Sequence, residues 1–390
     1  MSNDKIWNNV DFKQSDNNVF EERLEDIRFL IGKVQFSNKN IYWEYGNKRL
    51  ANRHMLVTGK SGQGKTYFIQ RILSQFIDNS INSLIIDYTN GFLPNQLDPL
   101  FSEKYNDNIK HRIVYKEKLP INPFKLQMID FGGIIEEENV EDMVDRVVQI
   151  LDFVFDLGIQ QRALLNDIIV EGYRINGEKY TFSYLERSLK ESENKAAQTL
   201  YGRLQPLLTR DPFMYDSDFN WSEIFNNNGE VHIFQLAPFQ KNIQQAMVEF
   251  TLWDLYQYAT RTGSERKPLP IILDEVQNLS FSHNSPTSKI LREGRKFGIS
   301  GIFATQDIEA IKGDDSTSIF NVAEQVHFLP PDSQIQSIAK WISIDNDSKK
   351  KNESLLKKLH KGEALIYGPV SENGTLTEAR INVVSISSFN

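Results

Sequence analysis

Short apolar runs alternate with amphipathic segments along most of the chain. An apolar run bounded by polar residues or glycine predicts a buried strand, and apolar positions that recur every three or four residues predict a helix. The first such run is followed by a glycine-rich loop and by a helix whose apolar face contains Phe68, Ile72 and Phe76. Strands are predicted at residues 54–58, 83–86, 111–115, 231–236, 270–275, 300–305, 325–329 and 363–368.

Helical patterns separate most of these strands. This alternation predicts an α/β fold with a largely parallel central sheet that is covered on both faces. Between residues 131 and 215 only helical periodicity is present, so we expect an all-helical insertion that divides the core into residues 51–130 and 216–390. Residues 1–50 are predicted to form a polar N-terminal arm and a small β element.

The loop after the first strand carries a phosphate-binding motif. It fits G-x-x-x-x-G-K-[ST] at Gly59, Gly64, Lys65 and Thr66. In such a loop successive N–H groups converge on a phosphate, and the following helix adds its positive dipole end. Lys65 is expected to reach the β- and γ-phosphates and Thr66 to ligate Mg²⁺. The predicted nucleotide contacts are Gly59, Lys60, Ser61, Gly62, Gln63, Gly64, Lys65, Thr66 and Tyr67.

An acidic pair follows a later apolar run. Asp274 and Glu275 would stand at the carboxyl end of a strand, where ligands bind in open α/β sheets. Asp274 is expected to hold Mg²⁺ and Glu275 to polarise an attacking water. An acidic pair after a buried strand is common, so its weight comes from the phosphate loop earlier in the chain. Asp87, after the second strand, either positions water or Mg²⁺ or caps the next turn.

A basic segment precedes the strand at 300–305. Arg292 and Arg295 have only Glu293 as an acidic neighbour in sequence, and Gln306 ends the strand. Gln306 is predicted to sense the γ-phosphate. Arg295, with Arg292 as the second candidate, is predicted to reach the γ-phosphate of a neighbouring subunit, a contact worth ~10³–10⁵ in rate. The alternative is that Arg292 and Lys296, at positions i and i+4, lie on a solvated helix face.

Composition narrows the classes of function. The 390 residues include no cysteine, which excludes disulfides and thiolate metal sites. The six histidines are scattered along the chain. No apolar leader or long apolar run is present, so a soluble cytoplasmic protein without membrane contact is expected. A net charge of −8 argues against a surface coated for nucleic acid, but a ring with a locally basic channel stays open.

One lysine-rich stretch, residues 348–362, has two interpretations. It is either a solvated amphipathic helix with Leu355, Leu356 and Leu359 facing inward, or a contact to DNA or a neighbouring subunit. No Asn-Lys-x-Asp segment, which a GTPase would use to read its base, occurs in the chain, so ATP is the expected nucleotide.

The segments NRHMLVTGKSGQGKT, IILDE, REGRKFG and FATQ, in this order, resemble the HerA/FtsK class of ASCE P-loop ATPases. IIDYTNGF, INPF and GRKFGISGIFATQ are similar to the motor part of the DptH proteins of bacterial phosphorothioation-dependent restriction systems. The resemblance spans about residues 30–370 and implies a RecA-like P-loop NTPase core, DNA-stimulated ATP hydrolysis with Mg²⁺, a hexameric ring and double-stranded DNA in its channel. It also matches Lys65 and Thr66, Asp274 and Glu275, Gln306, and Arg295 to the motor's functional positions.

Three functions follow from these patterns. The first is an ATP-driven DNA translocase or helicase motor of an anti-phage or restriction system, with a nuclease or other defence effector as its partner. The second is an ATP-dependent ring scaffold that assembles and switches such an effector without pumping DNA. HerA proteins carry an N-terminal β-barrel, and the roughly 50 residues before the phosphate loop are too few for one, which favours the scaffold. The third, a metabolic kinase, has no use for an arginine finger and is disfavoured.

Overall fold

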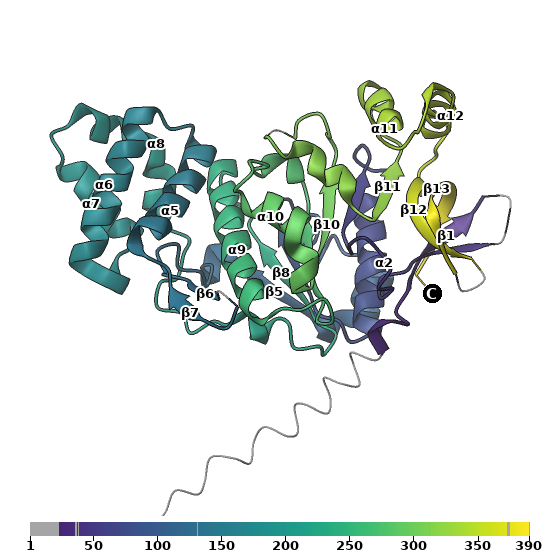
Figure 1. Ribbon diagram of the computed structural model, residues 1–390, viewed down its shortest axis with the longest axis horizontal. Coiled ribbons are helices and arrows are strands. Elements are labelled where there is room, and N and C mark those ends of the chain that lie inside the picture. Colours follow the sequence, from purple (N-terminus) through teal and green to yellow (C-terminus); the bar gives the residue numbers. More distant parts are fainter. Residues whose placement is uncertain are drawn as a thin grey trace, which may run out of the picture.

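The computed structural model describes residues 23–35, 37, 39–130, 132–311, 313–372 and 375–389. The N-terminal arm predicted from the sequence lies almost wholly outside the described residues. Within these ranges eleven strands form one sheet, in the order β2-β1-β13-β12-β11-β3-β10-β9-β4-β8-β5, and helices pack on both faces (Figure 1). The strands of this sheet are β1 Phe29–Val34, β2 Asn40–Trp43, β3 Met55–Thr58, β4 Ser83–Asp87, β5 Ile109–Ile113, β8 Val231–Gln235, β9 Leu269–Leu273, β10 Ile299–Thr305, β11 Glu324–Phe328, β12 Glu363–Glu372 and β13 Thr375–Ile386.

Seven neighbouring strands, from β11 to β5, run parallel. The predicted α/β fold with a largely parallel central sheet is therefore confirmed. Strand β3, which leads into the phosphate loop, pairs with β11 on one side and β10 on the other, and β10 separates it from β9. Because parallel strands place their carboxyl ends at one edge, the residues that follow β3, β4, β9 and β10 meet there.

The remaining four strands extend the sheet with antiparallel pairing. Strand β12 pairs with β11, and its hairpin partner β13 leads on to β1 and β2. The sequence analysis predicted only the first part of β12 and did not predict β13. Most side chains of β13 are half-buried or exposed, so the apolar pattern that reveals a strand is weak in this segment.

The sheet is apolar on both faces because helices cover both. Within β3, Met55 and Val57 join the hydrophobic cluster under α2 (Lys65–Asp78) and α3 (Pro99–Tyr105), whereas Leu56 joins the opposite cluster. That opposite face is covered by α9 (Lys241–Thr262) and α10 (Pro286–Glu293), as Figure 1 shows. Successive side chains of β3 thus enter hydrophobic clusters on opposite faces of the sheet, which explains why the sequence of this strand is continuously apolar.

Four helices form a separate body at the side of the sheet, on the left in Figure 1. Its entry and exit are hydrogen-bonded together: the Leu119 N–H donates to the Pro212 carbonyl (2.7 Å), and the Met214 N–H donates to the Leu119 carbonyl (2.8 Å). The predicted strand at 111–115 ends early, because a short helix, α4 (Val114–Glu117), begins there. The segments between α4 and β8 are the hairpin β6 Met128–Asp130 and β7 Ile135–Glu137, followed by α5 Val140–Phe155, α6 Ile159–Asn176, α7 Phe182–Glu191 and α8 Lys195–Arg210.

Two helices, α11 (Ile335–Trp341) and α12 (Asn346–Lys357), pack beside β12. Leu356 and Leu359 are buried in that small cluster and Leu355 is partly buried, so the lysine-rich stretch is an amphipathic helix with its leucines inward. None of the helices in the described ranges has the length and apolarity that a bilayer crossing requires.

Candidate active site

The phosphate loop connects β3 to α2, and its backbone conformation requires glycine at two positions. Gly59 has a φ of 142°, and a Cβ at this position would lie 2.6 Å from the Cβ of Phe328. Gly64 precedes the first turn of α2 with a φ of 117°, in the left-handed region that side chains disfavour. The loop therefore turns tightly enough for the N–H groups at the start of α2 to point into it.

Lys65, the first residue of α2, folds back over the loop. Its ammonium group donates to the Gly59 carbonyl at 2.6 Å and lies 3.4 Å from the Lys60 carbonyl. Burial lowers the pKa of Lys65, and the negative charges of Asp274 and Glu275 oppose that shift. This interaction indicates that the acidic pair, two strands away in the sheet, faces the phosphate loop.

The acidic pair stands directly after β9. Strand β9 ends at Leu273, earlier than the predicted 275, and the Glu275 N–H donates to the Asp274 carboxylate (2.9 Å). Glu275 has a φ of 52°, an uncommon value for a residue with a side chain and one that is often found at functional sites. Burial, and then the charge of Glu275, raises the pKa of Asp274 to about 6, while Lys65 acts in the opposite direction.

The donor set at this edge fits Mg²⁺. The Thr66 hydroxyl and the Asp274 carboxylate offer the hard oxygen ligands that Mg²⁺ prefers, and proteins commonly bind this ion through one or two such groups together with substrate phosphates. The raised pKa of Asp274 shows that its negative charge is poorly compensated by the protein alone. A cation at this position would relieve that cost, so Thr66 and Asp274 would hold the ion.

Gln306 directly follows β10, the strand that lies between β3, which leads into the phosphate loop, and β9, which precedes the acidic pair. Its side-chain amide donates to Oε1 of Glu275. The structure thus brings Lys65, Asp274, Glu275 and Gln306 together at the carboxyl edge of the sheet. The sequence analysis did not identify Gln277, whose amide donates to Oε2 of the same carboxylate. Its position two residues after Glu275 carries no periodic signal by which it could have been found.

Asp87 has the second of its two proposed roles, that of a cap. Its carboxylate accepts the Thr89 N–H (2.9 Å), the Thr89 hydroxyl (3.0 Å) and the Phe92 N–H (3.0 Å). The Gln235 amide adds a fourth hydrogen bond at 2.7 Å. These contacts fix the turn after β4, and the carboxylate still acts on Asp274 through its charge.

The far side of the phosphate loop is supported by residues that the sequence analysis identified only as a strand. His327 accepts from the Thr58 hydroxyl through Nδ1 (2.7 Å) and bonds the Gln325 side-chain oxygen through Nε2 (3.1 Å). The Gln325 amide nitrogen donates to the Phe320 carbonyl, so its oxygen must accept, and the His327 proton is on Nε2. Burial lowers the pKa of His327 to about 3, which keeps this support uncharged.

The remaining residues predicted to contact the nucleotide lie in the loop or in the first turn of α2. Lys60, Ser61 and Gly62 are exposed, and the Gln63 carbonyl accepts from the Gly362 N–H at 3.1 Å. Tyr67, in the first turn of α2, accepts the Phe389 N–H through its hydroxyl at 3.1 Å. The loop is therefore tied to the terminal strands while its tip stays accessible.

Arg295 and Arg292 lie outside this cluster. The Arg295 guanidinium donates to the Ala51 carbonyl (2.8 Å) and pairs with Glu265 (3.3 Å), at the amino end of β10 and opposite the phosphate loop. Arg292 pairs with Asp315. Both acidic partners are distant in sequence, so the residues around the two arginines do not reveal them.

Comparisons with known proteins identify the family and the fold. The sheet order, the phosphate loop after β3 and the acidic pair after β9 together define a RecA-like P-loop ATPase fold. The family model described as the central domain of helicase HerA matches residues 29–254, more than half of the chain, so the protein belongs to that family. A comparison with curated protein sequences finds no significant match.

Solved structures share the fold at low sequence identity. VirB4 of Thermoanaerobacter pseudethanolicus superposes with a TM-score of 0.65 and 16% identity, over 93% of this chain and 96% of that one. The bacterial conjugative coupling protein TrwBΔN70 superposes with a TM-score of 0.56 and 13% identity, over 95% and 92%. TrwB bound to a non-hydrolysable ATP analogue gives 0.55 and 15%, over 86% and 85%.

Proposed function

We propose that the protein is a Mg²⁺-dependent ATPase motor of the HerA type. The observation that carries the proposal is the meeting of Lys65, Asp274 and Glu275, which are brought together from β3 and β9 by the sheet order. A phosphate loop that faces a carboxylate pair is the arrangement that hydrolysis of a nucleoside triphosphate needs.

Each residue then has a defined part. The N–H groups from Gly59 to Thr66 and the Lys65 ammonium bind the phosphates, and bound Mg²⁺ would neutralise developing charge on them. Glu275 accepts a proton from the attacking water as general base. Gln306, from its place between β3 and β9, donates toward the terminal phosphate and reports its presence to Glu275.

ATP is the proposed nucleotide. Structures of TrwB contain an ATP analogue, a GTP analogue, or ADP with Mg²⁺, so these relatives support nucleotide use without choosing the base. The missing Asn-Lys-x-Asp segment is the feature of this chain that favours ATP over GTP.

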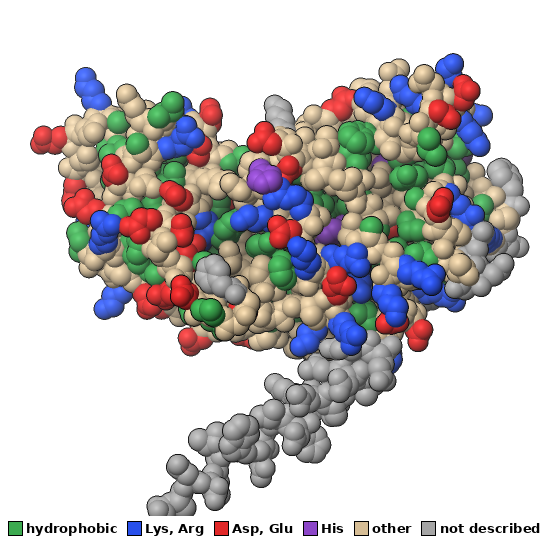
Figure 2. Space-filling model, in the orientation of Figure 1, with side chains coloured by type: hydrophobic (Ala, Val, Ile, Leu, Met, Phe, Trp, Pro, Cys, Tyr) green, Lys and Arg blue, Asp and Glu red, His purple; other side chains and the backbone are tan. Residues whose placement is uncertain are grey.

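Double-stranded DNA is the proposed track, and a hexameric ring the proposed assembly. The family name and the description of TrwB as a conjugative coupling protein support a DNA-handling motor. Although the net charge is −8, Lys and Arg side chains gather over the lower right part of the core on the face shown in Figure 2. Such a local concentration is what a salt-sensitive contact to phosphates requires. An anti-phage or restriction role with an effector partner rests on the DptH-like segments alone.

The test is steady-state ATP hydrolysis with Mg²⁺, measured for the wild type and for Glu275→Gln, with and without duplex DNA at low salt. The wild type should hydrolyse ATP faster than GTP, and DNA should stimulate it. Glu275→Gln should bind ATP with near-normal affinity and lose roughly 100-fold or more in rate. Equal rates for the two proteins would overturn the ATPase proposal. If duplex DNA neither binds to the protein nor stimulates hydrolysis, the scaffold is the better-supported function.

A further inference from the structure

Glu275 is held by two amides rather than one. Gln306 donates to Oε1 and Gln277 donates to Oε2 of its carboxylate. The first donor was expected from the sequence as a phosphate sensor, but the second belongs to a short 3₁₀ turn, Val276–Asn278, directly after the acidic pair. A carboxylate has about four acceptor positions, so two stay open after both amides are bound.

The orientation of the second amide is determined by β10. The Thr305 hydroxyl lies 2.6 Å from the side-chain oxygen of Gln277, and it also accepts the Asp307 N–H at 3.0 Å. Because the hydroxyl accepts from Asp307, its single proton is free to donate to Gln277. The oxygen of Gln277 is therefore the acceptor, and its NH₂ group must face Glu275.

These contacts form one directed chain of hydrogen bonds. It runs from the Asp307 N–H through the Thr305 hydroxyl and the Gln277 amide to Glu275 Oε2. Chains in which each group both donates and accepts are mutually reinforcing in a low-dielectric interior, and Thr305 is fully buried. The tip of β10 thus reaches Glu275 twice, directly through Gln306 and indirectly through Thr305.

The turn that carries Gln277 is also anchored from the opposite side. The Gln245 amide of α9 donates to the Asn278 carbonyl at 2.8 Å, and the Glu249 carboxylate accepts the Ser280 N–H at 2.7 Å. With its backbone held by α9 and its side chain held by Thr305, Gln277 has little freedom to leave Glu275.

We infer that Gln277, oriented by Thr305, is a positioning residue that holds the Glu275 carboxylate in the plane needed to orient the attacking water. The inference rests on the proposed ATPase function and adds a residue to it. Gln277 acts through Glu275, by the hydrogen bond that it donates to Oε2. Displacement of a reacting group by about 1 Å can cost about 100-fold in rate, so loss of this support should be visible in kcat.

The experiment compares ATP hydrolysis by Gln277→Ala, Thr305→Val, their double variant and Thr305→Ser. Thr251→Val serves as the matched control, because it removes a buried hydroxyl that donates to the Met247 carbonyl within α9, away from Glu275. Gln277→Ala and Thr305→Val should each lower kcat, by up to about 100-fold, with KM for ATP within about twofold of the wild type. Thr305→Ser, which keeps the hydroxyl, should recover most of the rate.

One further readout separates positioning from a merely structural role. The double variant should lose little more than the worse single variant, because both changes break one chain. If Gln277→Ala does not fold, the comparison of Thr305→Val with Thr305→Ser still decides.

Wild-type rates in both single variants, losses confined to KM, or single losses that multiply in the double variant would each overturn the inference. In those cases a normal wild-type rate and an inactive Glu275→Gln leave the ATPase proposal standing. A wild type that hydrolyses no ATP would overturn both.

Discussion

The amide of Gln306 donates to the carboxylate of Glu275, which joins the end of β10 to the end of β9, the neighbour of β10 on the side away from the P-loop strand β3. Because the NH₂ group of Gln306 has two N–H donors, it can bind a group beside β3 with one of them while the other holds Glu275.

Gln306→Glu should reduce hydrolysis strongly. The new carboxylate has the same shape but removes a donor from Glu275 and places a like charge beside it. Loss of one preorganised donor costs about 10²–10³ in kcat, while nucleotide affinity should change much less. Single-turnover hydrolysis and equilibrium nucleotide binding measure the two effects. Gln240→Glu, an exposed position before α9, is the control, and equal effects of the two substitutions would contradict the role of Gln306.

Asp274→Asn should stabilise the protein and abolish its Mg²⁺-dependent activity. The pKa of Asp274 is raised to about 6, above its value in an unfolded chain, so the folded state binds more protons between about pH 4 and 6. Stability from this group is therefore lost as the pH rises through that window. The neutral amide should raise the free energy of unfolding at pH 7 by roughly 3 kcal/mol in nucleotide-free buffer.

Denaturant unfolding at pH 4, 6 and 8 measures this effect. The difference between Asp274→Asn and the wild type should be smallest at pH 4 and grow with pH. Glu103→Gln, an exposed change on α3, should show no such trend. A variant that is less stable than the wild type at pH 8 would contradict the prediction.

Arg295 should act in a neighbouring subunit. Its pairing with Glu265 places it at the amino end of β10, opposite its own phosphate loop. Arg295→Ala and Glu275→Gln should each lose most activity, by ~10³-fold or more for the arginine. When the two are mixed and allowed to reassemble, sites built from the intact Glu275 of one chain and the intact Arg295 of the other should regain hydrolysis.

Lys296→Ala is the control for that experiment, since it removes an adjacent exposed cation. It should hydrolyse ATP at the wild-type rate. A mixture no more active than its components would show that Arg295 is not shared between subunits.

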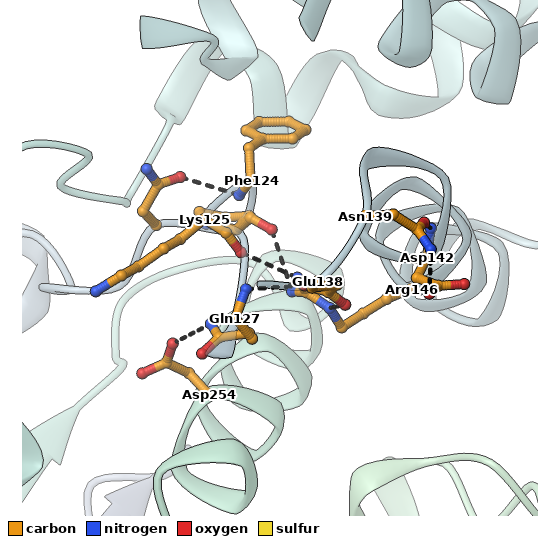
Figure 3. A network of polar contacts seen from close by, with 10 residues as sticks. Phe124, Lys125, Gln127, Glu138, Asn139, Asp142, Arg146 and Asp254 are labelled. Atoms are coloured by element: carbon orange, nitrogen blue, oxygen red, sulfur yellow. Dashed lines mark hydrogen bonds and ion pairs between the residues drawn. The ribbon is translucent and has the colours of Figure 1, made fainter. Parts of the chain in front are cut away.

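Arg146 should be essential for the packing of α5 against the segment that precedes it in the chain. Its guanidinium pairs with Glu138 at 2.8 Å and donates to the Lys125 carbonyl (Figure 3). It also donates to the Pro123 carbonyl, and both charged side chains are about 6% exposed. Arg146→Ala leaves a buried carboxylate unpaired, which costs about 3–5 kcal/mol.

The matched control is Arg174→Ala, which breaks an exposed pair with Glu141 (2.7 Å) on the same helical body. It should cost less than about 1 kcal/mol. Urea unfolding of both variants measures the difference. Replacing the buried pair together, with Arg146→Met and Glu138→Leu, should recover part of the loss, and a cost for Arg146→Ala no larger than that of the control would contradict the prediction.

Features that depend on nearby residues could be predicted from the sequence. The phosphate loop at Gly59 to Thr66 and the acidic pair at Asp274 and Glu275 are each encoded within one strand and the turn that follows it. Their convergence could be predicted too, because parallel strands share a carboxyl edge.

Features that depend on pairing across the fold could not be predicted. Glu265 pairs with Arg295 only because two loops at the amino edge of the sheet meet. Gln277 turns toward Glu275 because Thr305, on another strand, fixes its amide. Strand β13 is recognisable only through its partners, since its own side chains are mixed in character.

The helical body begins and ends at one point of the core. Hydrogen bonds join Leu119 to Pro212 and Met214, so the chain leaves the core and returns to it at one point, and the segment between packs against α9. Segments attached in this way behave as exchangeable cassettes, because their length and sequence can drift without disturbing the strands that flank them. Related motors could thus acquire new partners by replacing this cassette while the phosphate loop and its acidic counterpart stay unchanged.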